Sequence, residues 1–512
     1  MREKKRERKR FIMTREKVST IDQSGVQYRR AKLWQIILYA TNALCGMTVY
    51  SLMNTYANYI AGLGFAITAV AAGAIITGSR VLDAITDPLL ALVYDKVETK
   101  WGKLRILLIG GFLLEAIALL LMYDGAAKAH LTGTAGLIVF CVLYVVYIIG
   151  YTAQNMTAQT LPAIMSNDPK QRPTIGVWVT AFNYLVPVVL SVVTNNIMLP
   201  RFGGQINLEF MSAVAKLFML LGFIGVVLVS IGVSEFDKPE YYKGAVKHEP
   251  LKIKDMLEVL AHNKPLQSYI AAQSSDKIAQ VTASQGVITT MLAGILIGNM
   301  GMATILTVVS MLPSIIFAMF GARYAGKHGS KKAIITWTKV CTVISLVALA
   351  FFVTVNFSGV GTKSIASFGP TMILYVVITL ALNGAKMCVT TASNSFMADV
   401  IDYELDRSGR YVPAVMTGTY SLIDKLISSF GALIAGLAIV IAGYHGTARP
   451  QPGDPATSAV FWVTMVVMYV VPILGWLVTL IAMKPCKLDK AEMVEVQKRI
   501  ASAKEAAKAE QA

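Results

Sequence analysis

The chain has 512 residues, of which 55% are hydrophobic and 15% are charged, and its mean hydropathy is +0.57. Soluble domains carry about 25% charged residues, so the composition excludes an ordinary soluble enzyme or binding domain and indicates an integral membrane protein. The formal net charge of +17 would also suit a nucleic-acid-binding protein, but its distribution along the chain argues against one.

Hydrophobic segments of about 20 residues, long enough to cross a bilayer as helices, recur along the whole chain. We predict twelve of them, centred near residues 48, 80, 113, 147, 186, 222, 280, 311, 344, 382, 428 and 471. The seventh is the least regular, because Asp276, Lys277 and several Ser and Gln residues interrupt it. The predicted fold class is an all-α integral membrane protein with twelve transmembrane helices.

Basic residues gather before the first span and in every second loop. These loops comprise residues 95–105, 166–173, 235–265, 323–332 and 404–410, followed by the tail after Lys484. Since Lys and Arg favour cytoplasmic loops, the pattern predicts a multi-pass protein of the plasma membrane with both termini in the cytoplasm. The excess charge then serves topology and contact with the lipid bilayer, and no nucleic-acid partner is expected.

Motifs of enzymes and metal sites are missing from the sequence. The five cysteines form no CxxC pair, the five histidines form no HExxH motif, and neither a GxSxG motif nor a Gly-rich phosphate loop occurs. The chain is therefore not expected to be an enzyme or to hold a cofactor. The basic N-terminal segment lacks the apolar core of a signal peptide, and the start stays open between Met1 and Met13.

The most distinctive motif, RVLDAITDPLLALVYDKVETKWGKLR, occupies residues 80–105. Asp83 and Asp87 are four residues apart on a predicted helix, so they share one face, and Arg80 lies on that face one turn earlier. A charged side chain inside a membrane is costly unless it is paired or faces a polar cavity. The motif predicts a polar interior lined by this helix. The alternative is an Arg–Asp pair that only locks helices together.

The middle of the chain divides it into two halves. Residues 235–265 form the longest polar stretch between spans, and their KIKDMLEVLAHN segment has the spacing of a short helix on the membrane surface. The loops YDKVETKWGKLR and GARYAGKHGSKKA, after the second and eighth spans, are alike. Two six-helix bundles with matching loops indicate the major facilitator fold, with a substrate site near the middle of the membrane. The predicted divisions are a basic segment 1–33, bundles 34–234 and 266–484 around the loop 235–265, and a tail 485–512.

These motifs together resemble those of the glycoside–pentoside–hexuronide:cation symporters, the melibiose-carrier family of the major facilitator superfamily. Three further segments are similar to that family: NDPKQR at 167–172, MADVIDYELDRSGR at 397–410 and DKLISSFGA at 424–432. The resemblance implies a secondary active transporter in which a cation gradient drives symport of a small polar solute, such as a sugar, glycoside or hexuronide.

The resemblance also implies a cation site between the second and fourth helices. Asp83 and Asp87 match the family's two carboxylates and are the expected ligands of a metal ion such as sodium, which prefers oxygen. Oxygen atoms of Thr86, Thr152 and Asn155 could complete the site. Protons could use the same acids, so the coupling ion stays open between sodium, lithium and the proton.

The predicted substrate site departs from the family. On an ungapped match, amides or a threonine stand where the family has two aspartates, an aromatic ring and an arginine, whereas the lysine of the eleventh helix is retained. The predicted substrate-binding residues are Asn42, Asn155, Gln159, Thr180, Lys425 and Lys386. Because amides replace acids, electrostatics favours a neutral or anionic solute over a cationic one.

Lys386 has no counterpart in the family, and a lysine inside a membrane span is either paired or functional. It is expected either to bind an anionic substrate or to pair with Asp276 or Asp424. Closure of the cytoplasmic side is expected to use ion pairs of the basic loops 96–105 and 323–332. The predicted gating residues are Arg80, Lys103, Asp399, Asp402 and Arg410.

Two other functions stay open. A carrier of the same fold could transport a lipid-like cargo or another organic anion, although Asn42, Gln154, Asn155 and Gln159 imply a polar cavity. A non-transporting membrane sensor is the other alternative. The oligomeric state also stays open.

Overall fold

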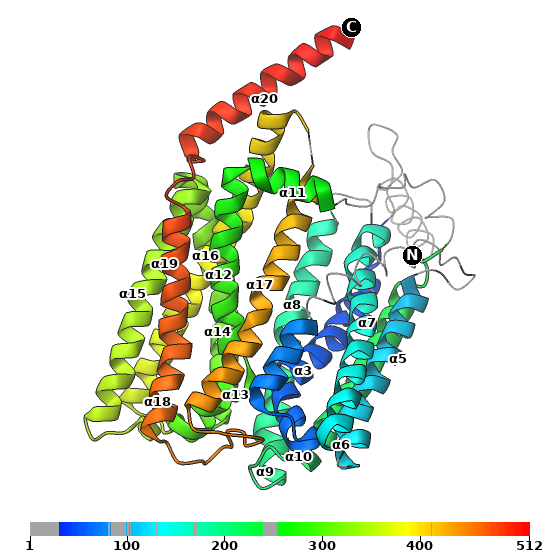
Figure 1. Ribbon diagram of the computed structural model, residues 1–512. Helices are drawn as coiled ribbons and strands as arrows, with labels where there is room; N and C mark the ends of the chain where they lie inside the picture. The colour runs from blue at the N-terminus through cyan, green and yellow to red at the C-terminus, as the bar shows by residue number, and fades with distance from the viewer. Residues whose placement is uncertain are drawn as a thin grey trace, which may run out of the picture.

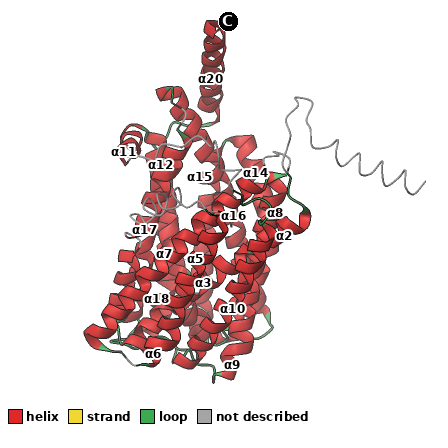
Figure 2. Ribbon diagram, turned by 90° about the vertical axis from the view of Figure 1, so that its right-hand side faces the viewer, coloured by secondary structure: helices red, strands yellow, loops and turns green. Residues whose placement is uncertain are grey.

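The computed structural model describes residues 30–79, 104–129, 131–166, 171–238, 253–410 and 412–511, together with residues 82, 99 and 102. All the regular secondary structure of these residues is helical. The long helices stand side by side, and those of the N-terminal half lie beside those of the C-terminal half (Figures 1 and 2). The predicted all-α class is confirmed.

The N-terminal half consists mostly of long apolar helices. They are α2 (Leu33–Ala40), α3 (Asn42–Phe65), α5 (Leu104–Leu120), α6 (Ala126–Lys128), α7 (Gly133–Met165), α8 (Arg172–Ser191), α9 (Leu199–Arg201) and α10 (Leu208–Gly232). Two π-helical segments, η1 (Leu121–Gly125) and η2 (Val192–Met198), continue α5 and α8.

The C-terminal half begins with the short helix α11 (Ile253–His262), which corresponds to the expected surface helix. It continues through α12 (Lys264–Ala283), α13 (Gly286–Thr289), η4 (Thr290–Ile297), α14 (Gly301–His328), α15 (Ser330–Phe357), η5 (Thr362–Ala366) and α16 (Pro370–Ser408). It ends with α17 (Pro413–Ile441), α18 (Ser458–Met465), η6 (Val466–Val470), α19 (Val471–Ala482) and α20 (Lys490–Gln511).

The helices correspond in order to the predicted spans. Among the described residues, nine helices are long and apolar enough to cross a membrane, and α12 with the segment Gly286–Ile297 forms one further span that is bent by 60°. The 28-residue helix α14 lies where the eighth span was predicted, and the second span is described only as the apolar helix Ala69–Ser79. The predicted twelve spans are consistent with this arrangement.

Local signals explain where several helices begin and bend. Asn207 and Asn263 precede α10 and α12, and each side-chain Oδ1 accepts a hydrogen bond at 2.8 Å from the backbone N–H three residues later. Such caps satisfy N–H groups that have no partner within the helix. The seventh span bends where Gln285 adopts an extended conformation (φ −62°, ψ 135°) between α12 and α13.

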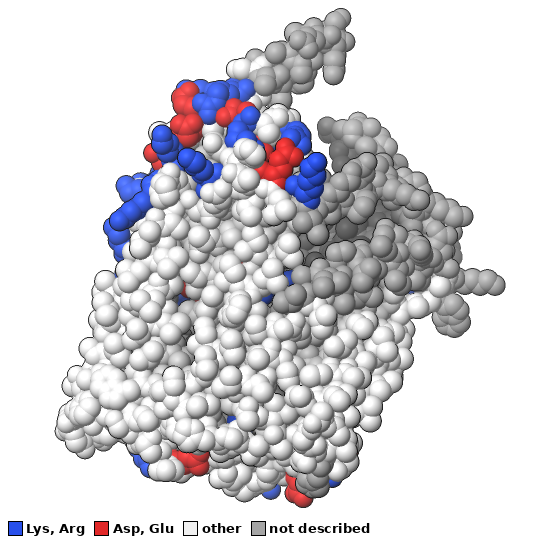
Figure 3. Space-filling view, in the orientation of Figure 1, with Lys and Arg blue, Asp and Glu red and all other residues white. Residues whose placement is uncertain are grey.

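The two ends of the molecule differ in charge. We call the end with α11 and α20 the tail end and the end with α6, α9, α13 and α18 the distal end (Figure 1). On the face in Figure 3, Lys, Arg, Asp and Glu gather at the tail end, and a broad uncharged belt lies below them. Apolar side chains such as Leu113, Ile117 and Phe223 are exposed on the helices, as expected of a surface in contact with lipid.

Candidate functional site

A cavity of about 230 Å³ lies between the two halves, and we call it the central cavity. The N-terminal half contributes residues of α3 and α7, and the C-terminal half contributes residues of α12 and α17. The lining side chains that can donate or accept hydrogen bonds are Tyr50, Asn54, Tyr144, Tyr147, Tyr151, Lys277, Gln285, Asp424, Lys425, Ser428 and Ser429. A polar cavity between two bundles is where transporters of this architecture bind their substrates.

Three tyrosines of α7 form one wall of the central cavity. Tyr144, Tyr147 and Tyr151 are three and four residues apart, so they lie on one face of the helix. The ring centroids of Tyr144 and Tyr147 are 5.5 Å apart, and those of Tyr147 and Tyr151 are 5.8 Å apart. Each ring offers an apolar face and a polar hydroxyl. The sequence analysis missed this wall, although the spacing of the tyrosines on a predicted span was a usable signal.

The opposite wall carries charge. Lys277 of α12 and Asp424 and Lys425 of α17 line the cavity. Asp424 has one buried carboxylate oxygen, Oδ1, without a hydrogen-bond partner in the described part of the chain. Such an atom can accept a hydrogen bond from a ligand. Lys425 was predicted as a substrate residue, whereas Lys277 was noted only as an interruption of the seventh span.

The other predicted substrate residues whose side chains the structure describes do not line the central cavity. Asn42 is the first residue of α3, and its buried Oδ1 has no partner among the described residues. Asn155 is half-buried on α7 near the buried Thr152, which was predicted as a cation ligand, whereas Thr180 is exposed on α8. None of these four is among the residues that the structure describes as lining the central cavity. Gln159 also lies on α7, and the structure does not describe its side chain.

Several predicted site residues fall outside the residues that the structure describes. They are the cation ligands Asp83, Asp87 and Thr86 and the gating residues Arg80 and Lys103.

A second cavity of about 190 Å³ opens between helices of the C-terminal half, and Lys386 lines it together with Asp276 and Lys277. The Trp476 indole N–H donates to Asp276 Oδ1 at 2.9 Å, and the Lys386 ammonium lies 5.7 Å from the centroid of the Trp476 ring. Lys386 and Asp276 form no direct ion pair, although they interact electrostatically. The structure thus brings together Lys386 and one of its two predicted partners.

At the tail end, the predicted gating residues bind elements of their own half. Asp402 accepts a hydrogen bond from Gln497 of α20 at 2.7 Å, and Arg410 pairs with Glu258 of α11 at 2.9 Å. Asp399 interacts with Ser330, the first residue of α15. None of the hydrogen bonds between described residues joins the two halves at this end. Among the residues that the structure describes, these three therefore make no ion pair between the halves at the tail end.

The distal end is closed by hydrogen bonds between the halves. The buried Arg449, in the loop between α17 and α18, donates to the backbone carbonyls of Asn58 at 2.9 Å and Ile67 at 2.8 Å. Burial lowers the pKa of this guanidinium to about 10, so it stays charged at neutral pH. The Gln451 side chain donates to the Ile206 carbonyl at 3.0 Å and accepts from its N–H at 2.9 Å.

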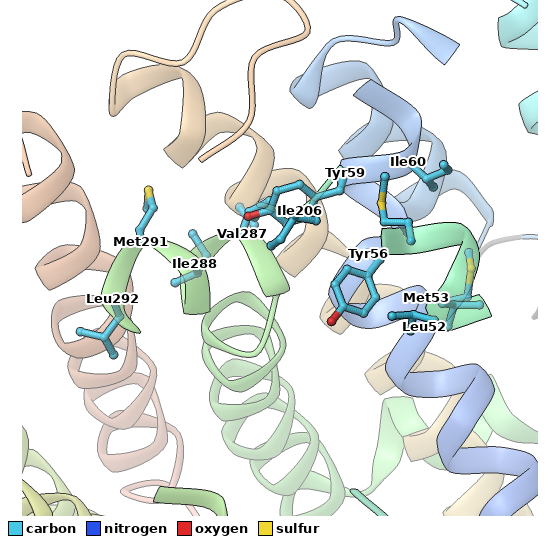
Figure 4. Packing of buried hydrophobic residues seen from close by; sticks show 14 of the residues in the cluster. Leu52, Met53, Tyr56, Tyr59, Ile60, Ile206, Val287, Ile288, Met291 and Leu292 are labelled. Carbon is cyan, nitrogen blue, oxygen red and sulfur yellow. The ribbon is translucent and has the colours of Figure 1, made fainter. Parts of the chain in front are cut away.

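Further contacts seal the same end. The Tyr59 hydroxyl donates to the Pro450 carbonyl at 2.7 Å, and Asn54 donates to the Ser284 carbonyl at 2.9 Å. In Figure 4, Tyr59 and Ile206 of the N-terminal half lie next to Val287 of α13. These contacts join the two halves at the distal end in this structure.

Comparison with known proteins gives the family. The sequence model of the family described as MFS/sugar transport protein matches residues 65–490. The chain is 26% identical over 435 residues to a putative glycoside/cation symporter, YagG, of Escherichia coli (strain K12), covering 83% of this chain and 86% of the relative. It is 21% identical over 497 residues to the lactose permease of Leuconostoc lactis, covering 93% and 73%, respectively.

Solved structures share the fold at low sequence identity. The crystal structure of the nucleoside transporter NupG matches with a TM-score of 0.54 and 14% identity, covering 87% of this chain and 98% of NupG. A bacterial homolog of the human lysosomal transporter Spinster, in an inward-facing and unoccupied conformation, matches with a TM-score of 0.57 and 12% identity, covering 92% and 98%. The family model spans most of the chain, and the chain therefore belongs to the MFS/sugar transport protein family and is a secondary transporter rather than an enzyme.

Proposed function

We propose that the protein is a symporter that couples the entry of a cation to the transport of a sugar or glycoside across the plasma membrane. The printed descriptions of the relatives, a glycoside/cation symporter and lactose permeases, support this substrate class. The observation that carries the proposal is the central cavity, which has a tyrosine wall on one side and Lys277, Asp424 and Lys425 on the other.

This combination of walls suits a sugar. The C–H face of a pyranose ring is apolar and can stack on the rings of Tyr144, Tyr147 or Tyr151, while the tyrosine hydroxyls remain available for hydrogen bonds. Sugar hydroxyls both donate and accept, so they can donate to the Asp424 carboxylate and accept from the Lys425 ammonium. A lipid-like cargo could not donate a hydrogen bond to the buried Asp424 Oδ1, which has no partner among the described residues, and leaving such an atom unsatisfied is costly.

The coupling ion is proposed to bind at Asp83 and Asp87, with oxygen ligands from Thr86, Thr152 and Asn155. Thr152 and Asn155 lie three residues apart on α7, so their side chains share one face of that helix. Two carboxylates and neutral oxygens suit sodium or lithium, and the same carboxylates could carry a proton.

Transport is proposed to follow alternating access. The distal end is closed by Arg449, Gln451 and Tyr59, so the central cavity would receive substrate from that side only after these bonds break. The basic loops favour a cytoplasmic tail end, and the contacts of Arg449, Gln451 and Tyr59 would then close the opposite side of the membrane. Closure of the tail end would involve residues such as Asp399, Asp402 and Arg410.

Uptake into proteoliposomes tests the proposal. The full-length protein is reconstituted, and accumulation of labelled mono- and disaccharides is measured with a sodium gradient, with a pH gradient and without a gradient. We expect at least one sugar to accumulate only with one of the gradients. Lys425→Met should reduce this uptake, whereas Lys339→Met, which removes an exposed lysine of α15, serves as the matched control. Failure of every sugar to enter faster than into protein-free vesicles would contradict the proposal.

A further inference from the structure

The second cavity lies in the C-terminal half and adjoins the central cavity. We call it the side pocket, and its polar lining comprises Tyr269, Gln273, Asp276, Lys277, Gln280, Lys386, Thr390, Asn394 and Tyr420. Lys277 lines both the side pocket and the central cavity. The two cavities therefore meet at this lysine.

The side pocket is held in place by Trp476. Its indole N–H fixes the Asp276 carboxylate at 2.9 Å, and the face of its ring lies below the Lys386 ammonium, 5.7 Å away. A cation over an indole ring is attracted by the negative face of the ring. Trp476 itself is buried, so it holds these two charged groups without occupying the pocket.

The charges of the side pocket are unequal. Lys277 and Lys386 contribute two positive charges and Asp276 one negative charge, and Lys277 also interacts electrostatically with Asp424 of the central cavity. The residues that line the two cavities together include three lysines (Lys277, Lys386 and Lys425) and two aspartates (Asp276 and Asp424), so one positive charge is in excess. Neither ammonium group makes a hydrogen bond or a direct ion pair with a residue that the structure describes, although both interact electrostatically with Asp276. Each ammonium has three donors, and a net positive charge within a membrane is costly.

From this arrangement we infer that the side pocket binds an ionised acid group, a carboxylate or sulfonate, that belongs to the transported sugar. One such group would make the charge of the pocket neutral, and its oxygens would accept hydrogen bonds from Lys277 and Lys386. Asn394 and Thr390 could donate to the remaining oxygens. The inference rests on the proposed function, since the ring of the same substrate would lie against the tyrosines of the central cavity.

Two matched ligands test the inference. Methyl glucuronide and methyl glucoside differ only in a carboxylate or a hydroxymethyl group on the ring, and their dissociation constants are measured by titration calorimetry on the full-length protein. We expect Lys386→Met to weaken binding of the glucuronide by about tenfold or more and to change binding of the glucoside less than twofold. Lys339→Met is the control.

For a second variant we expect the opposite change in the affinity for the glucuronide. Asp276→Asn keeps an oxygen for the Trp476 indole but removes the negative charge, so it should tighten binding of the glucuronide and leave the glucoside unchanged. This result also guards against a folding defect of the Lys386 variant. Equal effects of Lys386→Met on both ligands, or none on either, would overturn the inference while the proposed function stands.

Acetate and chloride test whether the side pocket binds a free small anion rather than the acid group of the sugar. If either ion binds as tightly as the glucuronide and with the same dependence on Lys386, the pocket holds a separate small anion and the inference is wrong. If wild-type protein binds neither sugar and transports none of the labelled panel, the proposed function itself fails, and the inference fails with it.

Discussion

The two halves of the molecule offer the central cavity different chemistry. The N-terminal half presents the rings of Tyr144, Tyr147 and Tyr151, whereas the C-terminal half presents Lys277, Asp424 and Lys425. A ring face accepts many sugars, because every pyranose has an apolar face, whereas a charged group responds to the position of each hydroxyl. Selectivity between sugars should therefore reside mainly in the C-terminal half, whereas coupling to the cation should reside in the N-terminal half.

The sharpest test of this division removes coupling from the N-terminal half. With one coupled charge, a membrane potential of 100 mV can drive accumulation of about 50-fold. Asp83→Asn or Asp87→Asn should abolish this accumulation, so that the sugar only equilibrates across the membrane, because the cation loses a charged ligand. Exchange of labelled for unlabelled sugar should continue, since the central cavity is intact. Normal concentrative uptake by the Asp83 variant would remove this residue from the coupling site.

The contribution of the charged wall to sugar binding can be tested at Lys425. Lys425→Met should weaken the binding of a neutral glycoside by about tenfold, and Lys425→Arg should lose less, because it keeps the positive charge. Titration calorimetry of the purified variants measures the change. Unchanged affinity in the Met variant would show that the lysine does not contact the substrate.

The closed distal end provides a third test, because it is where both halves meet. Arg449→Met leaves the buried carbonyls of Asn58 and Ile67 without their donor, at a cost of about 1–3 kcal/mol. The balance should shift toward opening at this end. The labelling rate of a single cysteine in place of Ile206, in a background without the native cysteines, should rise several-fold.

The control for this experiment is Lys363→Met, which changes an exposed lysine of the distal segment η5. A labelling rate that is the same in the Arg449 variant, the control and the parent would exclude Arg449 from closure.

The smallest expected effect concerns the tyrosine wall. Tyr147→Leu should weaken sugar binding by about three- to tenfold, because an aromatic contact contributes about 0.5–1.5 kcal/mol beyond burial. Tyr147→Phe should change it less, since the ring remains. If the Phe variant loses as much affinity as the Leu variant, the hydroxyl rather than the ring face contacts the substrate, and the comparison between the walls needs revision.

The fold was largely predictable because its signals are local. Spans of apolar residues and the polar segment 235–265 are visible in the sequence, and the structure places helices in the predicted order. The exception is the seventh span, whose bend depends on Gln285 and its contact with Asn54 of the other half. A contact between residues so far apart in the chain could not be read from the sequence.

The candidate site was predictable in part, from a charge inside a span or from a retained family residue. Lys386 was found in the first way, Lys425 was found through the resemblance to the symporter family, and both line cavities. The spacing of Tyr144, Tyr147 and Tyr151 shows that they share one face of a helix, but which face lines the cavity depends on how the helices pack. The partners of Asp402 and Arg410 were missed because α20 and α11 dock on the C-terminal half through tertiary contacts.

The hydrogen bonds of Arg449 across the distal end predict the outcome of a genetic suppressor screen. Its acceptors on the other half are main-chain carbonyls, which exist whatever side chains occupy positions 58 and 67. Substitutions there cannot supply a complementary charge, as they could for an ordinary ion pair. A screen for suppressors of an Arg449 variant should therefore return reversion at the same codon or changes elsewhere that favour the closed distal end, and no charge-swapped partner.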